Sequence, residues 1–407
     1  MKQVKKFLYF AILAIAICFR ASDSDAWDQV SVRLFAYLEP EILIFSPIFP
    51  SEKGNYQAIA YSESFASGRS FTLSESDSLT VDICNDSLTV VIGSYKIVVD
   101  SIVINTNRPN KNLAAISGKG ETRIYRGNFK IISGRIPILI NMIDIEFYLN
   151  GVLPSEMQAL SPIEALKTQA VVSRSYALAN KGKHKTEGYD FCDLTHCQIY
   201  QGYRVETAAT RRAIEETAGQ VMMYENRVVE TPFSSNCGGV TASSYELWEM
   251  KSPLISVRDD LCARYPHYSW DFEIESRLLW EILHADPRTN PGNFLASVQI
   301  IKYGPSGRAI KIQIRGEWER IVSGFIFWAI LAKRLKWGKV KSTRFDLRQN
   351  RDIFIFHGNG FGHGVGLCQS GAIYRAYRGD SYRQILKYYF PKLCLSSIGV
   401  WDSFLKF

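Results

Sequence analysis

Beyond its first 26 residues the sequence has no apolar stretch long enough to cross a membrane, no internal repeat and no low-complexity linker. Its basic residues are scattered and form no block, although the formal net charge is +8 and the pI is near 8.9. These absences exclude a repeat array and a membrane-embedded body. Because 46% of the residues are hydrophobic, the chain can bury a real core and is not disordered. The charge excess favours polyanionic surroundings without naming a partner.

The first residues have the layout of an export signal. Three lysines among the first six residues precede an apolar run at 7–19, which is shorter than the roughly 20 residues of a spanning helix. We therefore expect residues 1–26 to be a cleaved signal peptide, with a retained N-terminal anchor as the alternative. Ile17 before Cys18 is too bulky for lipid attachment. The protein is expected to be exported, periplasmic or extracytoplasmic, to meet the membrane only through such an anchor, and to bind no nucleic acid.

The remaining chain has two regions of different texture. Residues 27–135 contain short alternating runs separated by Asn, Gly and Asp turns, which predict a β-rich N-terminal region. Residues 136–407 contain longer helical patterns interleaved with strands, including helices near Ile373 and Ile385. The predicted class is α+β, with three segments: 1–26, 27–135 and 136–407.

One acidic residue, Glu156, lies just before a strongly signalled helix. Ser161 can cap this helix, Pro162 suits its first position, and Glu164 is placed as a capping-box partner. Pro154 predicts a turn that would carry Glu156. A carboxyl group held by a loop on a rigid helix suits proton transfer. The alternative is a solvated surface acid.

Two further residues of this helix, Arg174 and Tyr176, are candidate substrate contacts. An arginine beside a carboxylate lowers its pKa, whereas a general acid needs a raised pKa. We therefore expect Arg174 to bind substrate rather than to pair with Glu156. The alternatives are a surface arginine and a core tyrosine.

Four residues within one short segment predict a zinc site: His184, Cys192, His196 and Cys197. Two thiolates and two imidazoles fill a tetrahedral shell, which is typical of a structural site. A disulfide between Cys192 and Cys197, or core thiols, are the alternatives. Without Cys18 seven of the 8 cysteines remain, so they cannot all pair within one chain.

Two glycine-rich segments allow a close approach to the backbone. Gly238 and Gly239 permit either contact with a ligand or a tight turn. Gly362 and Gly364 flank His363 in a loop that lacks the lysine and hydroxyl of a phosphate-binding loop. The loop suits the floor of a groove for an extended polymer. His363 is either a polar contact there or a hydrogen-bonded structural histidine.

Five motifs, taken in order, resemble the stage II sporulation protein D (SpoIID) family, which includes SpoIID lytic transglycosylases and LytB-type amidase enhancers. They read GVLPSEM, EALKTQAVVSRSYAL, CQIYQGY, TAGQVMMYENRVVETPFSSNCGGVT and GNGFGHGVGLCQSGAIYRAYRGDSYRQILKYYF, within residues 123–391. The resemblance implies that Glu156 is the catalytic acid, that Arg174 is needed for function, and that the His184 to Cys197 segment binds zinc. The sequence departs from the family pattern at Cys368 and Ser370, without affecting the acid.

The implied reaction is lytic cleavage of peptidoglycan glycan strands by a single carboxyl group. Glu156 would protonate the bond between N-acetylmuramic acid and N-acetylglucosamine, and the C6 hydroxyl of the substrate would close a 1,6-anhydro ring. The implied substrate is glycan stripped of its stem peptides, and a cell-wall amidase is the implied functional partner. The candidate substrate-binding residues are Arg174, Tyr176, Gln198, Tyr200, Gly238, Gly239, Gly362, His363, Gly364 and Gln369.

Two other functions are open at this point. A non-catalytic module could bind glycan and stimulate an amidase, as the name of the enhancers suggests. A zinc hydrolase would need an open coordination position, whereas four candidate ligands fill the shell.

Overall fold

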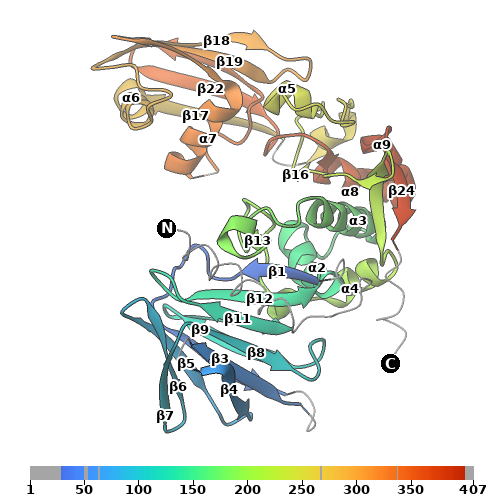
Figure 1. The fold of residues 1–407 in the computed structure, drawn as a ribbon. Helices are drawn as coiled ribbons and strands as arrows, with labels where there is room; N and C mark the ends of the chain where they lie inside the picture. The colour runs from blue at the N-terminus through green and yellow to red at the C-terminus, as the bar shows by residue number, and fades with distance from the viewer. Residues whose placement is uncertain (1–28, 50–53, 63–64, 266–267, 337, 399–407) are drawn as a thin grey trace, which may run out of the picture. The chain divides into compact units, whose positions relative to one another are not determined.

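The computed structural model describes residues 29–49, 54–62, 65–265, 268–336 and 338–398 (Figure 1). The predicted segment 1–26 lies outside them. The chain divides into two units, the first comprising 1–148 and 182–197 and the second 149–181 and 198–407. No helix among the described residues is both long enough and apolar enough to span a membrane.

The first unit is built from two sheets (Figure 1). Their strands include ones in which buried residues alternate with half-buried or exposed residues. One sheet has the order β13-β1-β12-β11-β8-β3-β4 and the other β10-β9-β2-β5-β6-β7. Phe45 of the second sheet contacts Tyr56 and Phe129 of the first, with ring centroids 5.2 and 5.3 Å apart. The strands are β1 (Gln29–Arg33), β2 (Leu43–Ile48), β3 (Tyr56–Ser62), β4 (Phe65–Leu73), β5 (Leu79–Cys84), β6 (Ser87–Ile92), β7 (Tyr95–Val99), β8 (Ser101–Thr106), β9 (Leu113–Gly118), β10 (Glu121–Arg126), β11 (Asn128–Ile132), β12 (Ile138–Asp144) and β13 (Phe191–Cys192).

The predicted β-rich N-terminal region is confirmed, but the first unit extends beyond residue 135. β12 pairs with both β1 and β11, and β13 pairs in parallel with β1. The short helix η1 (Lys185–Glu187) belongs to the same unit. The sequence pattern predicted that this region consists of 27–135 alone. Backbone pairing between residues far apart in the sequence adds 182–197 to it.

The second unit has two hydrophobic cores. The first core lies among helices α3, α8 and α9 and includes Val171, Leu367 and Ile385, all fully buried. Its elements are α2 (Ile145–Glu156, which begins in the first unit), α3 (Ile163–Ala179), η2 (Tyr203–Val205), α4 (Ala208–Glu215), β14 (Gln220–Tyr224), β15 (Arg227–Val228), β16 (Phe233–Ser234), α5 (Ser244–Trp248), η3 (Asp260–Arg264), β23 (Leu367–Cys368), α8 (Gln369–Tyr377), α9 (Tyr382–Tyr389) and β24 (Cys394–Ser397).

The second core of this unit lies between two three-stranded sheets and two helices. It includes Ile312, Phe327 and Phe356, which have no exposed surface. The sheets have the orders β17-β22-β21 and β18-β19-β20. The elements are β17 (Ser269–Glu275), α6 (Ser276–His284), β18 (Leu295–Tyr303), β19 (Ala309–Gly316), β20 (Glu319–Ser323), α7 (Gly324–Leu335), β21 (Phe345–Asn350) and β22 (Ile353–Asn359).

The fold is α+β, as predicted, and the helices near Ile373 and Ile385 are α8 and α9. The predicted cap of α3 is wrong. Pro162 takes the N-cap position without a side-chain hydrogen bond, because Ser161 instead closes a turn onto the carbonyl of Gln158 at 2.9 Å. Glu164 accepts the backbone N–H of Tyr382 at 2.7 Å, so it fixes the start of α9.

Candidate functional site

Glu156 is the last residue of α2, and the predicted turn after Pro154 is wrong. Proline inside a helix removes one hydrogen bond and costs about 3 kcal/mol. α2 nevertheless continues through Pro154, because Leu149, Val152 and Leu153 have no exposed surface and their burial outweighs this cost. The acid is therefore positioned by a helix end rather than by a loop.

The carboxyl group of Glu156 is held by one backbone donor. The N–H of Ile199 donates to its Oε1 at 2.7 Å. Burial raises the pKa of Glu156 from 4.5 to about 7, and the Ile199 hydrogen bond opposes this shift. A carboxyl group with a pKa near neutrality can both donate and accept a proton, as a general acid and base must.

A chain of glutamine and serine side chains fixes the helix end that carries Glu156. Gln369, the first residue of α8, donates to the backbone carbonyl of Glu156 at 2.9 Å and to Oε1 of Gln169 at 3.2 Å. Gln169 donates to the hydroxyl of Ser173 at 3.0 Å, and Gln198 donates to the Ser173 carbonyl at 3.4 Å. The terminal carbonyls of a helix need such partners. The structure thus brings Gln369 and Gln198 into one network with the acid.

Tyr200 packs directly on α2. A side-chain carbon at Gly151 would lie 2.5 Å from Cε2 of the Tyr200 ring, so only glycine fits there. Tyr200 is 1% exposed and Tyr176 9%. Both rings are therefore buried, and that of Tyr200 packs against the helix that carries the acid.

Arg174 has no exposed surface, and its guanidinium donates to the carbonyl of Gln220 at 3.1 Å. It connects α3 to β14 from inside the core. We predicted that Arg174 would bind substrate, but this arrangement instead supports a bracing role, because a side chain with no exposed surface cannot contact a polymer in this conformation.

The two glycine-rich segments lie together, since Asn236 and Phe361 exchange two backbone hydrogen bonds of 2.8 and 3.1 Å. Gly238 and Gly239 have φ of 76° and 105°, and Gly362 and Gly364 have φ of 100° and 75°, all of which favour glycine.

The space above Gly364 is filled by an arginine rather than open. A side-chain carbon there would lie 1.8 Å from Nη2 of Arg308. Nδ1 of His363 accepts the N–H of Val365 at 3.0 Å, and its ring lies 5.4 Å from that of Trp248. Burial and the nearby charge of Arg308 together lower the pKa of His363 to about 4. His363 is thus a neutral, hydrogen-bonded histidine.

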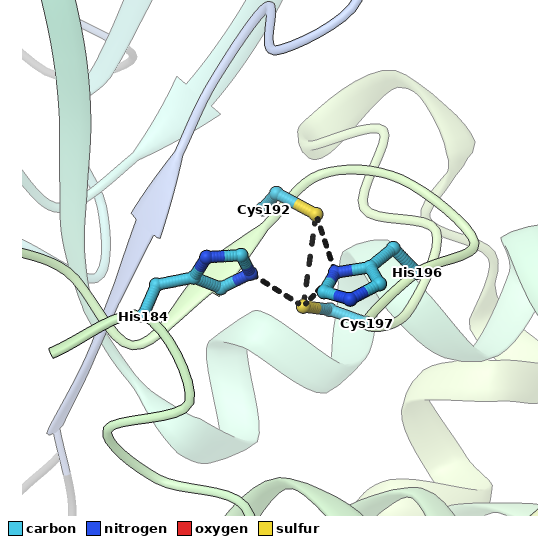
Figure 2. Close-up of side chains that lie close together, drawn as sticks. All are labelled: His184, Cys192, His196 and Cys197. Atoms are coloured by element: carbon cyan, nitrogen blue, oxygen red, sulfur yellow. Dashed lines mark hydrogen bonds between the residues drawn. The ribbon is translucent and has the colours of Figure 1, made fainter. Parts of the chain in front are cut away.

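The four predicted zinc ligands, here called the histidine–cysteine cluster, converge within the first unit (Figure 2). The Sγ of Cys197 lies 3.6 Å from Sγ of Cys192, 3.4 Å from Nε2 of His184 and 3.6 Å from Nδ1 of His196. The ligand atoms all lie within 4.8 Å of one another.

These separations fit a metal ion better than a covalent sulfur pair. A tetrahedral zinc site with bonds of about 2.3 Å spaces its sulfurs by about 3.8 Å, whereas a disulfide spans about 2.05 Å. Nδ1 of His184 lies 2.6 Å from Oε1 of Glu187, the kind of carboxylate contact that orients a metal-bound imidazole. The hydrogen bond between the two thiols lowers the pKa of Cys192 and raises that of Cys197. The cluster can hold a metal ion.

Sequence reasoning missed Gln169, Ser173 and Ile199. Gln169 and Ser173 lie four residues apart on α3 and are fully buried, so a polar pair on an otherwise apolar helix face was the available signal. Ile199 acts through its backbone N–H, which gives no signal in the sequence.

Comparisons with known proteins identify two family models that match separate parts of the chain. A family model described as stage II sporulation protein matches residues 136–224, which contain Glu156 and the histidine–cysteine cluster. A model of a domain of unknown function matches 252–366.

Three curated relatives are similar to the chain. An uncharacterized protein of Brachyspira hyodysenteriae is 30% identical over 259 residues, covering 62% of this chain and 67% of the relative. The amidase enhancer of Bacillus subtilis is 27% identical over 292 residues, and this chain spans only 40% of its length. The stage II sporulation protein D of Bacillus amyloliquefaciens is 27% identical over 292 residues, covering 65% of this chain and 77% of the relative.

Proposed function

This chain belongs to the SpoIID family, and we propose that it is an exported lytic transglycosylase of peptidoglycan with Glu156 as its single general acid and base. The observation that carries this proposal is the carboxyl group of Glu156, whose pKa burial raises to about 7. The relatives named stage II sporulation protein D and amidase enhancer support a role connected with the cell wall. The export-signal layout of residues 1–26 supports an exported location, where peptidoglycan lies.

The chemistry needs only one carboxyl group. Ordinary glycosidases use two, one for each face of the scissile bond. Here protonated Glu156 gives its proton to the oxygen between N-acetylmuramic acid and N-acetylglucosamine, and that bond breaks. The resulting carboxylate accepts the proton of the substrate's C6 hydroxyl as this oxygen attacks C1. The 1,6-anhydro ring forms, and Glu156 regains its proton. Attack within one molecule gains from proximity.

The surrounding residues hold the acid rather than react. Gln369 fixes the backbone carbonyl of Glu156, and the N–H of Ile199 fixes its carboxyl group. Arg174 braces α3 through the carbonyl of Gln220. Gln198, Tyr200, the glycine-rich segments and His363 remain candidates for shaping the glycan-binding surface.

His184, Cys192, His196 and Cys197 would hold zinc in a closed, structural site. Zinc bound there supplies folding energy and no step of the reaction. Peptide-denuded glycan is the proposed substrate, and an amidase that removes stem peptides is the functional partner.

The second candidate is a non-catalytic, glycan-binding enhancer of a cell-wall amidase. The observation in its favour is the similarity to the amidase enhancer of Bacillus subtilis. It predicts glycan binding that survives Glu156→Gln and no anhydro ends.

The deciding experiment is mass spectrometry of the products formed by the purified protein and by its Glu156→Gln variant. Each is incubated with intact peptidoglycan and with peptidoglycan pre-treated with an amidase. We expect anhydro-muramic ends from the wild type alone, mainly on the pre-treated material. Products with reducing ends would show that the protein hydrolyses the glycan and is not a transglycosylase. Glycan binding without any cleavage would establish the enhancer.

A further inference from the structure

A second cluster of metal-type ligands lies in the core of the second unit. Cys237, Asp259, Cys262 and Cys368, here called the buried cysteine cluster, have no exposed surface. Their ligand atoms all lie within 4.8 Å of one another. Sγ of Cys237 is 3.6 Å from Sγ of Cys262 and 3.7 Å from Oδ2 of Asp259.

Separate elements deliver these residues to one point. β16 and β23 pair in parallel, with Ser234 opposite Cys368, so Cys237 leaves β16 beside the start of α8. Asp259 is the N-cap of η3, which also carries Cys262. The convergence therefore depends on tertiary structure and not on a local sequence motif.

Backbone N–H groups point at the sulfur atoms, as they do around metal-bound thiolates. Cys237 donates its N–H to Sγ of Cys368 at 3.2 Å, and Gly239 donates to Sγ of Cys262 at 3.1 Å. The N–H of Gly371 in the first turn of α8 lies 3.5 Å from Sγ of Cys368. These donors stabilise negative charge on sulfur.

The carboxyl group of Asp259 has one partnered oxygen and one unpartnered oxygen among the described residues. The hydroxyl of Tyr389 donates to its Oδ2 at 2.7 Å. Its Oδ1 is buried and has no hydrogen-bond partner among the described residues. An unpartnered buried carboxylate oxygen is costly unless a cation or a donor satisfies it.

Positive charge surrounds the cluster. Arg308 is fully buried, and its guanidinium donates to the carbonyl of Cys237 at 2.7 Å. Arg375 interacts electrostatically with Asp259. Three thiolates and a carboxylate around a divalent cation keep a net negative charge, and these two arginines offset it.

We propose that Cys237, Asp259, Cys262 and Cys368 form a second structural zinc site. With zinc–sulfur bonds of about 2.3 Å and zinc–oxygen bonds of about 2.1 Å, a tetrahedral site spaces its ligand atoms by about 3.5 to 3.8 Å. The 3.6 and 3.7 Å separations match this spacing. Binding zinc displaces the protons of three thiols to solvent, with no change of oxidation state. All four positions are protein ligands, so the site is closed to water and substrate.

A disulfide between Cys237 and Cys262 is the competing arrangement in an exported protein. It would use two of the four groups and would not explain why Cys368 and Asp259 lie beside them. The zinc site accounts for all four.

The test is zinc analysis of the full-length protein by inductively coupled plasma mass spectrometry. The background is a Cys192→Ser, Cys197→Ser double variant, which empties the histidine–cysteine cluster. We expect one zinc per chain in this background, and the loss of that zinc on adding Cys262→Ser. Adding Cys84→Ser is the matched control, because Cys84 is an exposed thiol far from the cluster in sequence, and it should leave the zinc unchanged.

Zinc content that Cys262→Ser leaves unchanged would overturn the proposal, as would a Cys237–Cys262 disulfide found by peptide mapping of alkylated protein. If a variant does not fold, anomalous diffraction at the zinc edge from wild-type crystals replaces this comparison. A peak among the four side chains supports the site, and no peak there overturns it. Because none of these readouts measures glycan cleavage, the site can fail or stand independently of the proposed function.

Discussion

The histidine–cysteine cluster and the buried cysteine cluster differ in how far apart their residues lie along the chain. The first lies within 184–197, on one short segment, and its His196 is exposed. The second draws on 237–368, and all four residues are fully buried. A metal in the first would fix a local segment, whereas a metal in the second would tie together β16, η3 and the start of α8.

This difference predicts how much each metal would contribute to the stability of the fold. Losing a ligand from a partly exposed segment lets water replace it at modest cost. Losing a ligand from a dry core leaves charged groups without partners, which is among the most destabilising changes known. The two clusters should therefore respond very differently to the same Cys→Ser change.

The largest expected effect is that of Cys262→Ser. Loss of a metal ligand from a fully buried core leaves charged groups without partners, a change of the class that costs more than about 4 kcal/mol, so we expect the free energy of unfolding to fall by at least this amount. Urea unfolding followed by circular dichroism measures it, with Cys84→Ser as the exposed control. Equal unfolding midpoints for the two variants would break the comparison.

Glu156→Gln should affect chemistry and leave both clusters intact. Removing the acid should lower glycan cleavage by about 10² to 10⁴, because general acid–base catalysis contributes this much. Product mass spectrometry gives the rate, and zinc content and thermal melting are the controls. A variant that also lost zinc or its folded signal would show that the acid and the clusters are coupled, contrary to their separate roles.

Cys197→Ser should destabilise less than Cys262→Ser. We expect a loss on the order of 2 kcal/mol, since the segment it anchors is partly exposed. The same urea titration measures it, and the buried cysteine cluster should keep its zinc. A loss as large as that of Cys262→Ser would mean that exposure does not separate the two clusters.

The pH dependence of cleavage should reflect the protonation of Glu156 and not the loss of metal from either cluster. Burial raises the pKa of Glu156 from 4.5 to about 7. The protonated form is the proton donor, so the rate should fall as pH rises through 7, by about tenfold per unit above it. The native state also binds this proton more tightly than the unfolded chain. The stability that it contributes is therefore full below pH 4.5 and is lost as pH rises through about 7.

Cleavage rates between pH 5 and 9, with zinc content measured at each pH from 7 upward, check this prediction. A rate that is flat through neutrality while zinc stays bound would remove Glu156 as the proton donor.

The smallest expected effect is that of Gln369→Ala. It removes the hydrogen bond to the backbone carbonyl of Glu156 and the one to Oε1 of Gln169. The first is worth about 1 kcal/mol to the position of the acid, so cleavage should fall about fivefold with a small change in melting. Gln201→Ala, at an exposed glutamine, is the control. An unchanged rate would show that the helix end is held well enough by packing alone.

Local chemistry predicted much of the fold. The β-rich first region and helices α8 and α9 follow from alternation, turn residues and helical periodicity. The histidine–cysteine cluster was also predictable, because its ligands are close in sequence.

Non-local packing explains what could not be predicted. Burial of apolar residues carries α2 through Pro154 against its local preference. The N–H of Ile199 has no side-chain signature, and Arg174 looks like any basic residue until its burial is known. Asp259 and Cys368 are 109 residues apart in the sequence and form no recognisable motif. Only the folded chain therefore reveals the buried cysteine cluster.

The hydrogen bond from Gln369 to the carbonyl of Glu156 also sets an order of assembly during synthesis. Its two residues are 213 positions apart, so the partner of the helix end emerges from the ribosome long after the acid. Gly151 and Pro154 make α2 a poor helix by itself, at a combined cost of about 4 kcal/mol relative to alanine. A chain made only as far as α2 therefore carries the acid on a segment with neither its own helical stability nor its anchor, and the acid takes its final position only after Gln369 has been made.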